Sequence, residues 1–197
     1  NTLPLSSPLI CAPEYFPGLD FLSRLCSGKD AILDIGQPYR RQTLQNRTKI
    51  RTPIGWQWLS IPVIKQGRGT PISEIQIDYS SKWVQDHLKG LRYNYATAPF
   101  YEHYIPSITE FLLSEHDNLS DLTVKTVIWS LNVLKLPVDV TVNKAPGLNL
   151  SGVHTVTVTA APQNPEYRQN FPGFQAGMSV LDALFNHGPN AAGLVTK

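Results

Sequence analysis

The sequence predicts an α/β fold, a single domain with a mixed sheet, flanking helices and a helical middle segment. Short apolar runs near the N-terminus have the length of buried strands, and residues 44–63 alternate with a period of two. Residues 80–136 instead carry apolar side chains at helical spacing. The length of 197 residues suits one domain with a proper core.

The first elements predict a strand, a helix and a second strand. Residues 9–12 (LICA) form an apolar run that Pro13 ends, and residues 31–35 (AILDI) form another. Between them, residues 18–27 carry apolar side chains at helical spacing, with Gly28 just past the end. Such an opening usually makes a parallel pair joined by a right-handed crossover.

Residues 44–63 predict a β-hairpin. Over residues 44–52, one face carries Arg47, Lys49 and Arg51, and the turn Pro53-Ile54-Gly55 leads into a return strand at residues 56–63. We therefore expect three basic side chains in a row along one face of the hairpin.

The rest of the chain predicts helices in the middle and short strands around them. Ser80 is expected to cap a helix on which Trp83 and His87 stack, and a second helix begins at Pro99 with a break at Pro106. The remaining predictions are helices at residues 119–136 and 178–186, strands at 74–78, 138–142 and 153–158, and a loop at 163–173.

Composition excludes several classes of protein. An apolar content of 42% with 16% charged residues is normal for a globular protein and excludes disordered and coiled-coil chains. No apolar run approaches the roughly 18 residues of a membrane span, and the start lacks a signal-like pattern, so we expect a cytoplasmic protein unless a leader was removed. Cys11 and Cys26 are expected to be reduced, partly buried thiols.

The hairpin belongs to a basic segment that predicts an anion site. No acidic residue lies between Asp34 and Glu74, whereas seven of the 17 basic residues do. Arginines in a row can hold phosphate or carboxylate through bidentate hydrogen bonds. The alternative is a solvated face, the usual role of a charge run. Nucleic acid is disfavoured because the sequence pI is only about 8.5 and aromatic residues do not interleave with the basic ones.

His87 is a candidate proton-transfer group, although a histidine on a packed helix face is more often a core residue. Cys11 lies at the end of the first predicted strand, a position at which open α/β sheets commonly have their active sites. The sequence shows no general base that would activate this thiol as a nucleophile. Asp182 has two interpretations, a site residue or a residue that forms a hydrogen bond at a helix start, and the second is favoured. No histidine or cysteine pair has metal-ligand spacing, and no P-loop, GxGxxG or GxSxG motif is present, so no metal or cofactor is predicted.

Five ordered segments resemble the WbqC-like family, bacterial proteins often associated with surface-polysaccharide gene clusters. Ala12-Pro13-Glu14-Tyr15-Phe16-Pro17 is similar to the family's QPxYLP-type turn, with alanine in place of glutamine. The second segment contains Asp34, Gln37, Arg40-Arg41, Gln45-Asn46-Arg47 and Ile50, and the third is GWQWLSIPV. The fourth contains Trp83 and His87, followed by Tyr95 and Ala98-Pro99-Phe100-Tyr101. The fifth is SVLDALFNHGPNA. The chain is short for the family around residues 163–174.

The resemblance implies a single WbqC-like domain over residues 1–197 and an enzyme that modifies sugars or amino groups. The leading hypothesis is a cytoplasmic transferase that joins an acyl, aminoacyl or related group to an amine or nucleotide-linked sugar in O-antigen-type biosynthesis. Its substrate would be a small anion, either a nucleotide sugar or an activated acyl donor. The alternatives are a non-catalytic sugar-nucleotide binding or scaffold protein and, more remotely, an RNA-binding protein.

In the transferase hypothesis, the residues take three roles. Arg41, Arg47 and Lys49 hold the anionic part of the substrate, His87 transfers the proton, and Tyr15, Gln37 and Asn46 fix the orientation.

Overall fold

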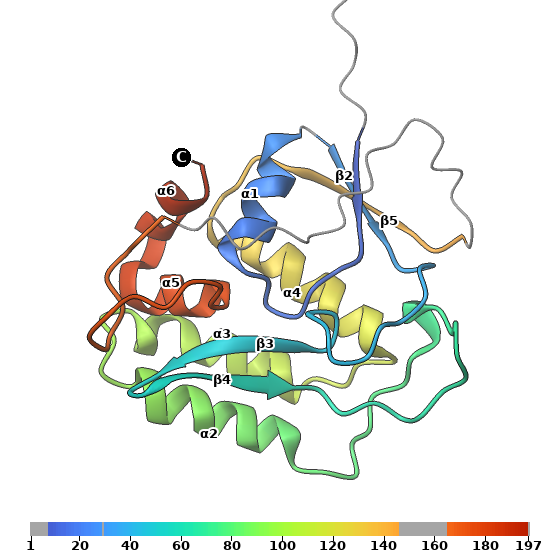
Figure 1. Ribbon diagram of the computed structural model, residues 1–197, viewed down its shortest axis with the longest axis horizontal. Coiled ribbons are helices and arrows are strands. Elements are labelled where there is room, and N and C mark those ends of the chain that lie inside the picture. The colour runs from blue at the N-terminus through green and yellow to red at the C-terminus, as the bar shows by residue number, and fades with distance from the viewer. Residues whose placement is uncertain (1–7, 29, 146–164, 197) are drawn as a thin grey trace, which may run out of the picture.

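Three parallel strands form a sheet at one end of the molecule in the computed structural model, which describes residues 8–28, 30–145 and 165–196 (Figure 1). The strands β1 (Leu9–Cys11), β2 (Asp30–Asp34) and β5 (Asp139–Asn143) lie in the order β1-β2-β5. Helix α1 (Leu19–Ser27) connects β1 to β2, and both strand pairs are parallel. The predicted strand, helix, strand opening and its parallel pairing are confirmed.

The hairpin forms a second, antiparallel sheet of β3 (Arg47–Thr52) and β4 (Gly55–Ser60). Lys49 pairs with Trp58, and Gly55 adopts φ +147°, a conformation that favours glycine at the turn. The α/β class with both kinds of pairing is thus confirmed, with the parallel and antiparallel strands in separate sheets. The hairpin is shorter than predicted, since residues 44–46 form a turn before β3.

Arg51 corrects the prediction of three exposed basic side chains in a row. It is only 3% exposed, and its guanidinium donates to the carbonyl oxygens of Thr52, Gly55 (2.7 Å) and Pro172 (2.6 Å). The segment around Pro172 therefore covers this end of the hairpin, and only Arg47 and Lys49 remain partly accessible.

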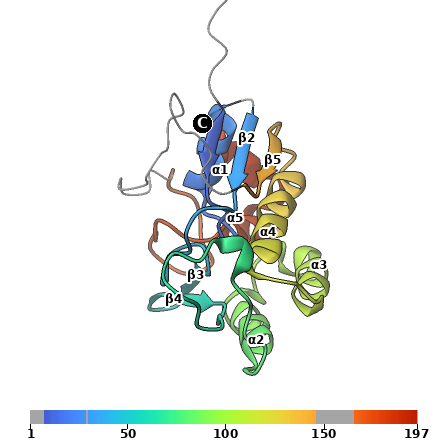
Figure 2. The same cartoon turned by 90° about the vertical axis from the view of Figure 1, so that its right-hand side faces the viewer.

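The helical middle consists of α2 (Trp83–Tyr95), α3 (Tyr101–Leu113) and α4 (Leu119–Val133). Helix α2 packs closely on the hairpin, because a Cβ atom at Gly90 would lie 3.1 Å from Gln57 Nε2. Figure 2 shows the parallel sheet at one end of the molecule and the hairpin with α2 toward the other.

Three local predictions about these elements were wrong. Ser80 does not cap α2, which begins at Trp83 with Lys82 at the N-cap position. Helix α3 continues through Pro106, which lies on the exposed side, where water can hydrate the carbonyl that loses its donor. Residues 74–78 form no strand; the 3-10 helix η1 (Ile72–Glu74) and an isolated bridge between Val63 and Ile77 take their place.

The chain ends in α5 (Val180–His187), η2 (Gly188–Ala191) and α6 (Ala192–Val195). The predicted strand at residues 153–158 lies outside the described residues. None of the helices in the described ranges has the length and hydropathy that a transmembrane span requires. Cys11 and Cys26 are both free thiols of intermediate exposure, as predicted.

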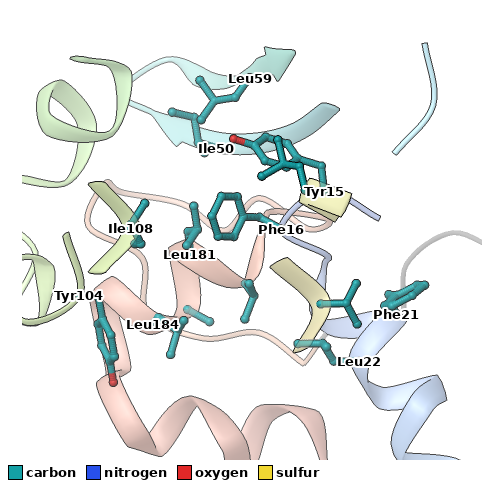
Figure 3. Packing of buried hydrophobic residues seen from close by; sticks show 14 of the residues in the cluster. Tyr15, Phe16, Phe21, Leu22, Ile50, Leu59, Tyr104, Ile108, Leu181 and Leu184 are labelled. Atoms are coloured by element: carbon teal, nitrogen blue, oxygen red, sulfur yellow. The ribbon is translucent and has the colours of Figure 1, made fainter. Parts of the chain in front are cut away.

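The turn at residues 12–17, which we call the post-β1 turn, lies at the centre of the core (Figure 3). Phe16 has the left-handed φ of +38°, and its backbone is held from three directions. Its N–H donates to Thr126 Oγ1 (3.1 Å), while its carbonyl accepts from Thr48 Oγ1 (2.9 Å) and Ser179 Oγ (3.0 Å). These bonds tie the turn to α4, β3 and the start of α5, so the backbone beside the end of β1 is fixed.

Asp182 binds the segment at residues 165–175 to α5. Its carboxylate is fully buried and accepts hydrogen bonds from Tyr95 (2.8 Å), Tyr167 (2.6 Å) and Gln169 (2.9 Å). The predicted bond at the helix start is not made by its side chain, since Ser179 Oγ accepts from the Leu181 N–H instead. Asp182 is therefore a structural acceptor within the C-terminal part of the core.

Candidate functional site

A cavity of about 390 Å³ opens beyond the carboxyl end of β1, and we call it the strand-end cavity. Open parallel sheets commonly bind ligands at this edge. The wall is made by the end of β1, the post-β1 turn, α1, the loop before β3, and the hairpin. Its polar and charged lining includes Cys11, Glu14, Arg24, Gln37, Arg40 and Arg47.

A second hollow, the loop cavity, lies on the other side of the loop that precedes β3. Its lining includes Tyr39, Arg41, Asn46, Arg47 and Val63. Arg47 and Gln42 line both cavities, so the two spaces share one wall.

Arg47 has the geometry of an anion-binding arginine. Its guanidinium carbon lies 3.9 Å from the centroid of the Trp58 ring, a stacking contact that fixes the plane of the group. Among the described residues it makes no hydrogen bond and no ion pair, and its Nε is buried without a partner. A buried donor without a partner is costly, so a ligand that accepts from this guanidinium gains more than it would from an exposed side chain.

Lys49 extends the same face of the hairpin. Its Nζ lies 4.4 Å from the ring centroid of Trp56 and 5.1 Å from that of Trp58. The Trp56 ring is itself 44% exposed. Cationic groups and indole rings therefore alternate along this face of the hairpin, which corrects the expectation that aromatic residues do not interleave with the basic ones. The strand pairing brings together residues that the sequence keeps apart.

The loop that carries Gln37 to Asn46 is held in place by hydrogen bonds to its neighbours. The Tyr39 N–H donates to the Thr70 carbonyl (2.8 Å), and the Arg40 N–H donates to Gln45 Oε1 (2.9 Å). Gln42 adopts φ +57°, an uncommon conformation for a residue other than glycine. Both cavities are therefore bounded by an ordered loop.

Glu14 and Arg24 line the cavity although the sequence did not single them out as site residues. Burial, and then the negative charge of Asp20, raise the pKa of Glu14 from 4.5 to about 8, although Arg24 opposes the shift. Burial raises the pKa of the Cys11 thiol to about 12, with Glu14 adding to the shift, so Cys11 is a poor nucleophile at neutral pH. The only signal for Glu14 in the sequence was its place in the turn directly after the first strand.

His87 lies in the core between the post-β1 turn and β4, and it is 3% exposed. Its Nε2 lies 3.1 Å from the Ser60 carbonyl oxygen, and its Nδ1 lies 3.0 Å from the Tyr15 hydroxyl. Because a carbonyl only accepts, Nε2 carries the proton, and Nδ1 accepts from Tyr15. Burial lowers the pKa of His87 to about 4, so the ring is neutral at pH 7.

Comparison with known families identifies the chain. The model of the WbqC-like protein family matches residues 12–160 and 152–193. The chain belongs to the WbqC-like family. The resemblance inferred from the post-β1 turn, the basic loop, the hairpin, α2 and α5 is thereby confirmed, since all of these lie within the matched ranges.

One relative of this WbqC-like chain is Rv1507c of Mycobacterium tuberculosis, described as an uncharacterized protein. It is 23% identical over 218 residues, which cover 92% of this chain and 94% of the relative. No solved structure matches the chain.

The WbqC-like structure divides the predicted site residues among three places. Gln37 lines the strand-end cavity, Arg41 and Asn46 line the loop cavity, and Arg47 lines both. Lys49 lies on the adjoining face of the hairpin. Tyr15 and His87 are hydrogen-bonded to each other in the core and line neither cavity. Transfer of a proton by His87 stays a prediction, and it would require the bond to Tyr15 or to Ser60 to open.

Proposed function

We propose that this WbqC-like protein is a cytoplasmic transferase of surface-polysaccharide biosynthesis, of the O-antigen type. It joins a small acyl, aminoacyl or related group to an amine or nucleotide-linked sugar. The anionic part of the substrate binds in the strand-end cavity. The observation that carries the proposal is the Arg47 guanidinium, stacked on Trp58 without a polar partner among the described residues.

The chemistry of the cavity favours phosphate or carboxylate. A guanidinium offers a planar fork that matches these anions, and each hydrogen bond to a charged group contributes ~1.5–3 kcal/mol. Arg24 and Arg40 line the same cavity, whereas Glu14 is its acidic residue. The volume of about 390 Å³ falls within the roughly 300–1,000 Å³ range of small-molecule sites.

The second candidate is a non-catalytic protein that binds a sugar nucleotide or serves as a scaffold in polysaccharide assembly. The observation that favours it is the position of His87, whose two ring nitrogens are already bonded within the core. The two candidates differ in turnover. If a His87→Ala variant keeps ligand affinity and loses turnover, the protein is an enzyme with His87 in the reaction.

A ligand screen by thermal shift tests the proposal. Nucleotide sugars, acyl phosphates and acyl thioesters are added to the wild-type protein and to Arg47→Ala, with Arg68→Ala as a matched control from the loop after β4. A ligand present at 100 times its Kd stabilises the folded state by about 2.7 kcal/mol, which raises Tm. We expect at least one class to raise the Tm of the wild type and of Arg68→Ala, but not that of Arg47→Ala. A flat response across all classes counts against an anion site.

A further inference from the structure

Glu14 lies in the post-β1 turn, at the wall of the strand-end cavity. The Glu14 carbonyl accepts from Thr126 Oγ1 (3.2 Å), and the next N–H, that of Tyr15, donates to the Leu44 carbonyl (2.9 Å). The side chain lines the cavity together with Cys11 of β1 and Arg24 of α1. The backbone of Glu14 is therefore held on both sides at the wall of the cavity.

The carboxyl group of Glu14 has no hydrogen bond or ion pair to any of the described residues. The nearest candidate, Arg24, is engaged elsewhere: its Nε donates to the Asp20 carbonyl (3.3 Å), its Nη2 lies 3.9 Å from Asp20 Oδ2, and its guanidinium lies over Phe21 (5.6 Å). Glu14 has intermediate exposure, and no described side chain engages its carboxyl oxygens in a structural contact. These oxygens are therefore not committed to holding the fold together.

We propose that Glu14 is the acid–base residue of the strand-end cavity, protonated while an anion is bound beside it and exchanging that proton during group transfer. The inference rests on the proposed function and deepens it. Two observations carry it: Glu14 lines the same cavity as Arg47, and its carboxyl group has no hydrogen-bond or ion-pair partner among the described residues. A neutral carboxyl group can donate a hydrogen bond to an anion that a carboxylate would repel.

The electrostatic surroundings agree with this role. Burial and Asp20 raise the pKa of Glu14 to about 8, close to the working pH that suits a general acid–base. An anion held by Arg47 adds a further negative charge nearby and raises the pKa of Glu14 again. Among the described residues, the titratable and charged groups that line the cavity with Glu14 are Cys11 on β1, Arg24 on α1, Arg40 on the loop and Arg47 on β3, and Asp20 on α1 adds its negative charge.

With an acyl thioester as donor and an amine as acceptor, Glu14 can supply the proton that the leaving thiolate needs and then take up the proton that the amine nitrogen releases. The neutral amine attacks the carbonyl carbon, so a C–N bond forms and the nitrogen becomes positively charged. The C–S bond then breaks, the thiolate leaves with the electron pair, and protonated Glu14 gives it a proton. The resulting carboxylate takes the excess proton from nitrogen, leaving an amide, a free thiol and Glu14 as it began.

Proton uptake on ligand binding tests this inference without any need for turnover. Binding of uridine diphosphate is measured by calorimetry at pH 8 in two amine buffers of different ionisation enthalpy, for the wild type, Glu14→Gln and the exposed control Glu102→Gln. We expect the wild type and Glu102→Gln to take up roughly 0.3–0.5 proton more per ligand than Glu14→Gln does. Glu14→Gln should bind at least as tightly as the wild type, because glutamine mimics the neutral acid.

The possible failures are distinguishable. Uridine diphosphate bound with the same proton uptake in the wild type and in Glu14→Gln would overturn the role of Glu14 and leave the anion site standing. If uridine diphosphate and pyrophosphate do not bind the wild type and every ligand class of the thermal screen also fails to bind, the proposed function is overturned, and this inference with it. A tenfold or greater loss of affinity in Glu14→Gln at pH 8 would also contradict a protonated Glu14.

Discussion

Replacing His87 by glutamine should remove most of the loss in the free energy of unfolding that His87 causes as the solution is acidified. The ring is neutral in the folded protein, where it donates to Ser60 and accepts from Tyr15. A glutamine amide also offers one donor end and one acceptor end, so the variant keeps the character of the two bonds and loses the titration.

The size of the effect follows from the shift in the pKa of His87 from 6.5 to about 4. In the unfolded chain the ring binds a proton as the pH falls below about 6.5, whereas the folded protein resists protonation until about pH 4. The contribution of the neutral His87 ring to the free energy of unfolding is therefore fully present above pH 6.5, and it is lost as the pH falls from 6.5 to about 4. At ~1.4 kcal/mol for each pKa unit, the whole window corresponds to ~3 kcal/mol.

Urea unfolding at pH 7.5 and pH 4.5 measures this difference directly. Between these values, the wild type should lose ~2–3 kcal/mol more free energy of unfolding than His87→Gln. His103→Gln, an exposed replacement on α3, is the matched control and should follow the wild type. Parallel pH profiles for the wild type and His87→Gln would refute the assignment of His87 as a buried neutral ring.

Three further predictions concern the hydrogen bonds of Asp182, the contacts of Arg51 with the segment around Pro172, and the N-cap of α4. Asp182→Ala should lower the free energy of unfolding in urea by ~3–5 kcal/mol, because the buried donors Tyr95 and Gln169 and the partly buried Tyr167 lose their acceptor. A loss below ~1 kcal/mol would contradict this. Arg51→Lys should speed trypsin cleavage at Arg168, since lysine cannot reproduce the forked contacts to the segment around Pro172; an unchanged cleavage rate would refute the role of Arg51 as its clamp. Asn118→Ala should lower the free energy of unfolding in urea by ~1 kcal/mol, because the Asn118 side chain caps α4 by accepting from the Asp121 N–H. An unchanged urea midpoint would contradict a stabilising role for this cap.

The elements that local pattern controls were predictable from the sequence. The apolar runs of β1 and β2, the period of α1 and the alternation of the hairpin each depend on residues close together in the chain. The parallel pairing followed from their order. The break expected at Pro106 failed because an exposed proline needs only water to satisfy the carbonyl it leaves free.

The parts that long-range contacts control were not predictable. Arg51 alternates with Lys49 in the sequence and yet is buried, since the segment around Pro172 covers it. The basic cluster correctly directed attention to Arg47, but neither its stacking on Trp58 nor its buried Nε is visible in a charge pattern. Glu14 was overlooked because only the fold shows that this residue lines the same cavity as Arg24 and Arg47.

An Arg47→Lys variant shows whether Arg47 holds the anionic part of the substrate. Lysine keeps the charge but loses the planar fork and most of the stacking on Trp58. The Kd of the nucleotide sugar or acyl donor selected by the thermal screen is measured for the wild type, Arg47→Lys and the control Arg68→Lys. The account predicts at least a tenfold weaker Kd for Arg47→Lys, ~1.4 kcal/mol or more, and an unchanged Kd for the control. Equal affinities for all three proteins would contradict it.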